Sequence, residues 1–270
     1  VAKGLGLEVT APIQSDTIIP DTVKQEVISN ANDLTAFLVT IRDANEIAIH
    51  VVTDGVGCDS AKLAGIAVSG SSGSAAYIPV LEYSNVMQGS LFESEPASNL
   101  SWIEPILAPV FKSKATRKII HNAKDSKWIL ARHGLGIEGE VFDVMLSGYV
   151  LQIVDSDFSP EHLSEVSLNL PIEKLPPRGV SSLPLDLVVN HSCKIVVNVK
   201  TMAKKFNQQL SELTSQQELL DILEIPVSSM LYKMESHGIK LDLEYLEQLK
   251  NDFSSRLESL QKEIYALAGE

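Results

Sequence analysis

The sequence is poor in cysteine and in basic residues, and it has no long apolar run. Its two cysteines, Cys58 and Cys193, are not at a metal-ligand spacing, and we expect both to be unpaired in a reducing compartment. No stretch of about 18 apolar residues is present to cross a bilayer, and the first residues lack the pattern of a secretory signal. These absences argue against a secreted or a membrane protein and favour a cytoplasmic one.

Basic residues are outnumbered by acidic ones, 22 to 35, which gives a formal net charge of −13. Because nucleic acids are bound largely through Lys and Arg side chains that neutralise phosphates, the isolated chain should bind DNA weakly. Two basic clusters remain, and a solvated helix face is a commoner origin of such clusters than a phosphate track. They comprise Lys112, Lys114, Arg117 and Lys118, and Lys200, Lys204 and Lys205.

The 270 residues, 44% of them hydrophobic, are enough for a main domain with its own core and a smaller appendage. Strand-like and helix-like segments alternate, which predicts an α/β fold. The expected strands are 46–53, 62–69, 75–81 and 117–121, and the expected helices are 32–38, 101–112, 124–134, 143–154 and 185–210. Four prolines make 171–184 a predicted surface loop.

The segment after Thr214 has a different character, because its apolar residues recur at helical spacing up to His237. Asp242 then stands where an N-cap would, and an amphipathic helix follows it. We expect this helix to leave an apolar face exposed, which self-association could cover.

Two segments carry motif-like residues. In the first, His50–Asp54 ends a predicted strand, and the next two strands contain Leu63–Ala67 and Ala76–Pro79. The second runs from a predicted strand into a helix and then into Gly139, Phe142–Asp143, Met145–Leu146 and Tyr149. Its spaced positions are Lys118, Asn122, Lys124, Ser126 and Leu130.

Together these segments resemble the 3′-5′ proofreading exonuclease domain of family A DNA polymerases, the bacterial DNA polymerase I family. The resemblance implies an RNase H-like (DnaQ-like exonuclease) α/β fold, a mixed sheet flanked by helices, with a helical extension at the C-terminal end. It divides the chain into a linker at 1–20, an exonuclease-like domain at 21–212 and the start of a polymerase domain at 213–270.

The resemblance also locates what this chain lacks. The four acids that bind metal in the family correspond to Val51, Thr53, Ser126 and Asn190, and the family's tyrosine corresponds to Asp186. Two-metal phosphodiesterases hold their divalent ions through carboxylates, and the residues here are apolar or neutral. We therefore expect no cofactor for this chain and no exonuclease activity, with Mg²⁺ required only by a parent polymerase.

The expected role is then structural. The domain would support DNA synthesis and repair by a bacterial polymerase, with the remainder of that chain as its partner and DNA contacted through the parent. Two alternatives stay open. One is an active exonuclease that uses the neighbouring acids Asp54, Asp125 and Asp186, and the other is a module that binds single-stranded DNA or a partner without cutting. His50 and His191 are expected near the cleft as packed, hydrogen-bonded side chains and not as metal ligands.

Overall fold

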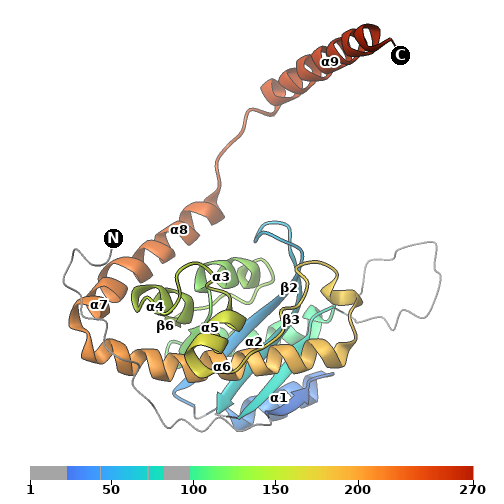
Figure 1. Ribbon diagram of the computed structural model, residues 1–270. Coiled ribbons are helices and arrows are strands. Elements are labelled where there is room, and N and C mark those ends of the chain that lie inside the picture. The colour runs from blue at the N-terminus through green and yellow to red at the C-terminus, as the bar shows by residue number, and fades with distance from the viewer. Residues whose placement is uncertain (1–22, 43, 72, 82–97, 270) are drawn as a thin grey trace. The chain divides into compact units, whose positions relative to one another are not determined.

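The computed structural model describes residues 23–42, 44–71, 73–81 and 98–269, so the predicted linker at 1–20 lies outside the described residues. Its centre is a six-stranded sheet in the order β1-β4-β3-β2-β5-β6 (Figure 1). The strands are β1 (Lys24–Val27), β2 (Glu46–Asp54), β3 (Lys62–Ser71), β4 (Ser74–Pro79), β5 (Arg117–Ile120) and β6 (Val141–Asp143).

The sheet is mixed, as predicted. β3 pairs antiparallel with both β2 and β4, whereas β2 with β5, β5 with β6, and β1 with β4 are parallel pairs. A register shift between Val52 and Thr53 marks the end of β2 as irregular. Irregularities of this kind re-aim side chains beside functional sites.

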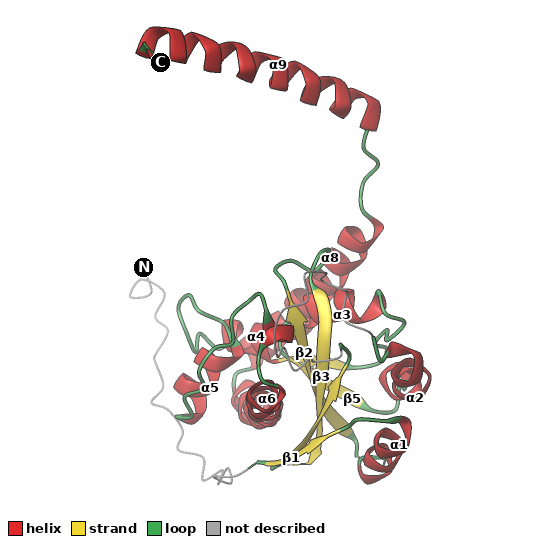
Figure 2. Ribbon diagram, turned by 90° about the vertical axis from the view of Figure 1, so that its right-hand side faces the viewer, coloured by secondary structure: helices red, strands yellow, loops and turns green. Residues whose placement is uncertain are grey.

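Helices cover both faces of the sheet (Figure 2). α1 (Ala31–Thr40), α2 (Leu100–Lys112) and α3 (Ala123–Ala131) lie on one side, and α4 (Val144–Val150), α5 (Pro160–Leu168) and α6 (Leu185–Glu212) lie on the other. Side-chain alternation along β2 explains the two cores. Ile47 and Ile49 join the cluster that contains α1 and α2, whereas Ala48 and Val52 join the cluster that contains α6.

Two sequence expectations need correction on this side of the sheet. The helix predicted over 143–154 ends at Val150, and α5 was not predicted at all. Ser159 caps the start of α5, Pro160 occupies its first turn, and Asn169 closes it in the left-handed conformation. Loop 171–184 was predicted correctly apart from a short 3₁₀ helix, η2, at Val180–Ser182.

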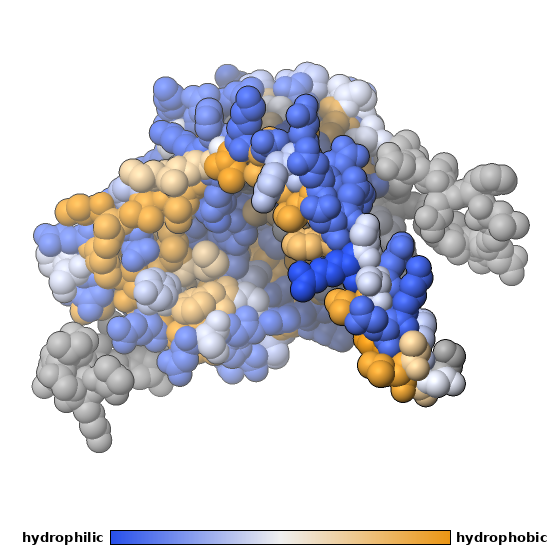
Figure 3. Space-filling model, turned by 90° about the horizontal axis from the view of Figure 1, so that it is seen from above, coloured by the Kyte–Doolittle hydropathy of each residue, from blue (hydrophilic) through white to orange (hydrophobic). Residues whose placement is uncertain are grey.

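The chain divides into two compact units between Tyr232 and Lys233. The first unit ends with α7 (Thr214–Glu218), the π-helix η3 (Leu219–Glu224) and most of α8 (Ile225–His237). Apolar side chains of these elements, including Ile222 and Met230, are exposed. The space-filling view shows apolar side chains gathered in patches at the surface (Figure 3).

The second unit consists mainly of α9 (Leu243–Ala268), which Asp242 caps as predicted by accepting the N–H of Tyr245. Leu246, Phe253 and Leu257 are exposed, so the apolar face expected from the sequence is present. That copies of the chain associate through this face stays a prediction. Among the helices that the structure describes, none has the length and hydropathy needed to cross a membrane.

Candidate functional site

A cleft of about 330 Å³ lies where β2 and β5 end, and it takes further side chains from α3 and α5. The ends of adjacent parallel strands meet at one edge of a sheet, which is the usual place for a binding site in open α/β folds. Its lining residues are His50, Val51, Thr53, Gly55, Gly57, Cys58, Ala61, His121, Asn122, Asp125, Ser126, Ile129, Pro160 and Glu161.

The first two motif segments meet in this cleft. Val51 and Thr53 reach it from β2, and Ser126 reaches it from the first turns of α3. Ser126 is buried, and its hydroxyl donates to the carbonyl oxygen of His121 over 3.4 Å. Three positions that the sequence predicts to be equivalent to metal-binding acids therefore share one cleft. Their side chains offer it one isopropyl group and two hydroxyl groups.

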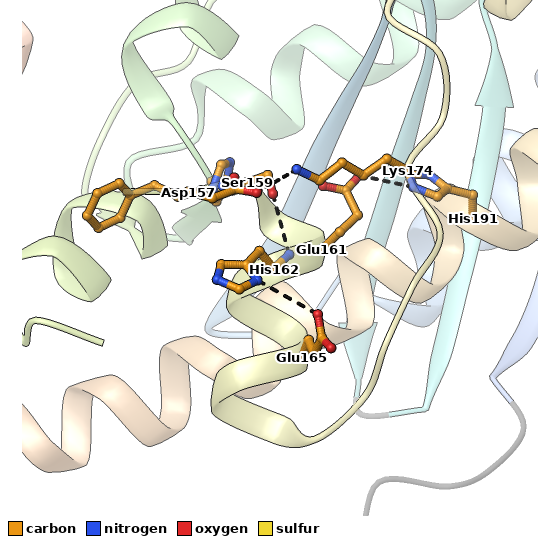
Figure 4. A network of polar contacts seen from close by, with 9 residues as sticks. Asp157, Ser159, Glu161, His162, Glu165, Lys174 and His191 are labelled. Atoms are coloured by element: carbon orange, nitrogen blue, oxygen red, sulfur yellow. Dashed lines mark hydrogen bonds and ion pairs between the residues drawn. The ribbon is translucent and has the colours of Figure 1, made fainter. Parts of the chain in front are cut away.

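The two predicted positions on α6, Asn190 and Asp186, are placed differently. Asn190 does not line the cleft; it is exposed on α6, and its side-chain oxygen accepts a hydrogen bond of 3.0 Å from Nε2 of Gln25 in β1. Asp186 is also exposed and outside the lining. His191, which follows Asn190 in the sequence, is buried and points toward α5 (Figure 4). Of the described residues that line the cleft, none belongs to α6, so the equivalence predicted for Asn190 and Asp186 stays a prediction.

The acids of the relocated-site alternative are not brought together either. Asp125 lines the cleft, but Asp54 and Asp186 do not. The Asp54 carboxylate instead accepts hydrogen bonds from the backbone N–H groups of Gly179 (2.7 Å) and Ser181 (3.0 Å) and from the Ser181 hydroxyl. Partial burial alone would raise the pKa of Asp54, but these donors hold it below its ordinary value. Asp54 thereby fixes loop 171–184 to the end of β2.

Asp125 belongs to the cap of α3. Asn122 has the left-handed φ of 54°, its side-chain oxygen accepts the N–H of Asp125, and its amide group donates to the Asp125 carboxylate over 2.9 Å. Asp143 anchors the same turn by accepting the N–H of Ala123 (2.7 Å), while it also caps α4. Asp125 thus faces the cleft with part of its carboxylate already bound.

Three histidines and one glutamate surround the inner end of the cleft, and we call them the His–Glu cluster: His50, His121, His191 and Glu161. Nε2 of His191 lies 3.1 Å from Oε1 of Glu161 (Figure 4), and Nε2 of His121 lies 2.6 Å from the carbonyl oxygen of Phe158. The rings of His50 and His191 have centroids 6.4 Å apart. His50 and His191 are packed near the cleft, as the sequence predicted.

Burial dominates the electrostatics of this cluster. It lowers the pKa of His50 to about 3, with a further decrease from His191, and it lowers the pKa of His121. Burial alone would raise the pKa of Glu161, but the hydrogen bond with His191 holds it below its ordinary value. At neutral pH the His50 and His121 rings are therefore neutral and Glu161 is ionised.

The two basic clusters of the sequence contribute lysines to the core and not only to a solvated face. Lys118 is fully buried, and its Nζ donates to the carbonyl oxygens of Ser113 and Glu138. Nζ of Lys200 donates to the carbonyl oxygens of Gly70 (2.6 Å) and Glu46 (3.2 Å), and Lys205 donates to that of Ser167. These ammonium groups are bound to backbone oxygens.

A pair of divalent ions does not fit this set of donors. Mg²⁺ and Ca²⁺ require several oxygen ligands, most of them charged, and the carboxylates in the lining are those of Asp125 and Glu161. Glu161 is occupied by His191, and Asp125 by Asn122. Within the described residues no group of three or more His, Cys, Asp or Glu side chains is arranged to hold a metal ion.

The mixed sheet, its flanking helices and the cleft define the class of DnaQ-like exonucleases, which have an RNase H-like fold. Escherichia coli RNase D, an exoribonuclease, superposes with a TM-score of 0.60 at 11% identity over 78% of this chain and 51% of that one. The POL domain of Pol1 from M. smegmatis, in complex with DNA primer-template and dNTP, gives a TM-score of 0.61 at 21% identity, covering 91% of this chain and 38% of that one.

The family itself follows from the sequence comparison, in which a family model described as 3′-5′ exonuclease matches residues 25–258. The chain belongs to the 3′-5′ exonuclease domain family of family A DNA polymerases. DNA polymerase I of Synechocystis is 24% identical over 264 residues, which are 93% of this chain and 26% of that protein. DNA polymerase I of Chloroflexus aurantiacus is 25% identical over 90% of this chain and 26% of its own length. The chain thus spans about a quarter of these relatives.

Proposed function

We propose that this chain is an exonuclease-like domain that does not cut DNA and that serves as a structural part of a DNA polymerase I-like protein. The observation that carries the proposal is the meeting of Val51, Thr53 and Ser126 in one cleft. Hydrolysis by this fold depends on divalent ions that activate a water and stabilise the leaving oxygen. These positions offer an isopropyl group and two hydroxyls, and the cleft's carboxylates, Asp125 and Glu161, are bonded to Asn122 and His191, so the cleft does not hold such ions.

The relatives support the second half of the proposal, because each contains this region within a chain about four times as long. Domain and polymerase would then act as one protein in DNA synthesis and repair, with Mg²⁺ used by the polymerase. The two free cysteines, one of them buried, favour the reducing bacterial cytoplasm as its compartment.

The decisive experiment is digestion of a 3′-labelled single-stranded oligonucleotide by excess protein across Mg²⁺ and Mn²⁺ concentrations. We expect no shortening. Metal-dependent shortening that an Asp125→Ala, Asp186→Ala double variant abolishes would overturn the proposal and establish the relocated site. Shortening that survives in the variant would point to a contaminating nuclease. The digestion would then be repeated with protein from a second, independent purification.

The cleft itself favours a scaffold over a module that binds single-stranded DNA. Its lining includes the carboxylates of Asp125 and Glu161 and, among the described residues, neither Lys nor Arg. Phosphate entering it would meet the like charge of these two carboxylates. Fluorescence anisotropy with a labelled single-stranded oligonucleotide distinguishes the two, since salt-dependent binding without metal would favour the module.

A further inference from the structure

We propose that the His–Glu cluster is an acid-sensitive latch that holds the start of α5 against the cleft at neutral pH and releases it on acidification. The inference concerns the stability of this segment and is independent of the proposed loss of nuclease activity. It rests on the contacts that fix α5, on the crowding of imidazole rings behind them, and on the shortage of carboxylates to neutralise those rings.

Two histidines from different elements hold the start of α5. His121, at the end of β5, bonds to the carbonyl oxygen of Phe158 just before the helix, and His191, on α6, bonds to the Glu161 carboxylate in its first turn. α5 has only nine residues, and Leu163 is its one buried large apolar side chain. A helix this short depends on its tertiary contacts, and the two histidine bonds are among those that attach its start.

The same contacts tolerate neutral imidazoles much better than charged ones. Nδ1 of His191 is buried, and no hydrogen-bond partner for it exists among the described residues. His50 stands with its ring centroid 6.4 Å from that of His191, so that positive charges on both rings would repel each other.

The charged groups around the cluster do not compensate for three such charges. His50 faces His191, His121 and Glu161, and His121 faces Asp143 and Glu161. Asp143 is already engaged by four backbone N–H groups, and Glu161 also faces the cation of Lys174 in loop 171–184. On α3, Asp125 is bonded to Asn122 and lies near Lys124. Glu161 remains as the main partner for three rings.

The direction of the pH effect follows from linkage. Burial holds the pKa of His50 and His121 below the ordinary 6.5 of an exposed imidazole, so their neutral forms favour the closed segment. Their contribution is complete above about pH 6.5 and decreases as the pH falls. Consider a histidine that stays neutral in the closed segment and has the ordinary pKa of 6.5 in the open segment. At pH 5.0 it increases the equilibrium constant for opening by about 30-fold.

Hydrogen–deuterium exchange followed by mass spectrometry tests the latch on the whole chain. We compare peptides covering 157–168 with peptides of α1 at pH 7.5 and pH 5.0, after correction for the intrinsic exchange rate. We expect the opening constant of 157–168 to increase by at least about 30-fold while that of α1 changes much less. Equal changes in both regions would overturn the latch.

Three variants assign the effect to residues. His50→Phe removes a ring that can ionise and should remove a factor of about 30. His121→Gln keeps a donor for the Phe158 carbonyl without an ionisable group and should also reduce the pH dependence. His162→Gln, on the solvent side of α5, is the matched control and should behave as the wild type. If neither cluster variant reduces the pH dependence, the latch is wrong.

Discussion

His191 and Glu161 join α6 to α5 across 3.1 Å, beside the cleft that Glu161 helps to line. Both side chains are largely buried, with 8% and 13% of their side-chain surface exposed. This contact connects two helices beside the cleft through an imidazole and a carboxylate. A bond of this kind makes a measurable contribution to stability, and its dependence on pH has a defined sign.

Replacing Glu161 by Gln should lower the free energy of unfolding at pH 7 by about 1–2 kcal/mol, because a charge-assisted bond to His191 becomes a neutral one. The pKa of Glu161 in the folded chain lies below its ordinary value, so its contribution is present above about pH 4.5 and is lost as the pH falls through the folded value. Urea unfolding at several pH values measures this. The control is Glu165→Gln, at an exposed position of the same helix.

Asp143→Asn should cost about 2–3 kcal/mol, since the carboxylate accepts N–H groups of Asn122, Ala123, Met145 and Leu146 and an amide nitrogen would oppose some of these donors. Thermal and urea unfolding report the loss. Asp155→Asn, at an exposed position nearby, should be close to neutral. An Asp143→Asn protein as stable as the wild type would contradict the assigned role.

Gly65→Ala should destabilise the sheet by about 2–3 kcal/mol or more, because the new methyl carbon would lie 2.0 Å from the hydroxyl oxygen of Tyr77, which is fully buried. Gly136→Ala is the matched control, since the nearest atom to its methyl group is 4.0 Å away. A Gly65→Ala, Tyr77→Phe double variant should recover part of the loss. Equal unfolding midpoints for Gly65→Ala and Gly136→Ala would refute the close contact between Gly65 of β3 and the Tyr77 side chain of β4.

Carboxylates introduced at Val51, Thr53 and Ser126 should allow the cleft to bind a divalent ion, whether or not activity follows. In a Val51→Asp, Thr53→Glu, Ser126→Asp triple variant, three carboxylates join Asp125 in the cleft, so like-charge repulsion should lower the melting temperature without metal. Millimolar Mn²⁺ should raise it again by several degrees, as binding to the folded state alone requires. The wild type should not respond. A triple variant indifferent to Mn²⁺ would show that these positions do not converge.

The sequence predicted the four central strands of the sheet, β2 to β5, and most helices, because their apolar residues repeat with clear periods. It missed α5 because that helix is short and buries one large apolar residue, Leu163. The signals that mark it are local: Ser159 as N-cap, Pro160 in the first turn and Asn169 as the left-handed C-cap. Missing α5 also meant missing Glu161, and with it the partner of His191.

The cleft was predictable where strand and turn geometry fix a register, and less so on the long helix α6. Val51, Thr53 and Ser126 were placed by flanking landmarks in β3, β4 and the α3 cap. On a helix, successive residues are turned by about 100°, so one residue decides between core and solvent. Asn190 and His191 are both polar, and hydrophobic periodicity did not distinguish the exposed one from the buried one.

Asp143 binds the first residues of two helices that come from separate stretches of the chain, α3 and α4. Its bonds to α4 are local, because Asp143 is the N-cap of that helix, whereas its bonds to the N–H groups of Asn122 and Ala123 reach the residues that follow β5. The start of α3 therefore gains these two bonds only when β5 and β6 have paired and brought the carboxylate to it. A folding intermediate in which the first turn of α3 is stable should also contain the β5–β6 pair, which makes this corner of the molecule a single cooperative unit.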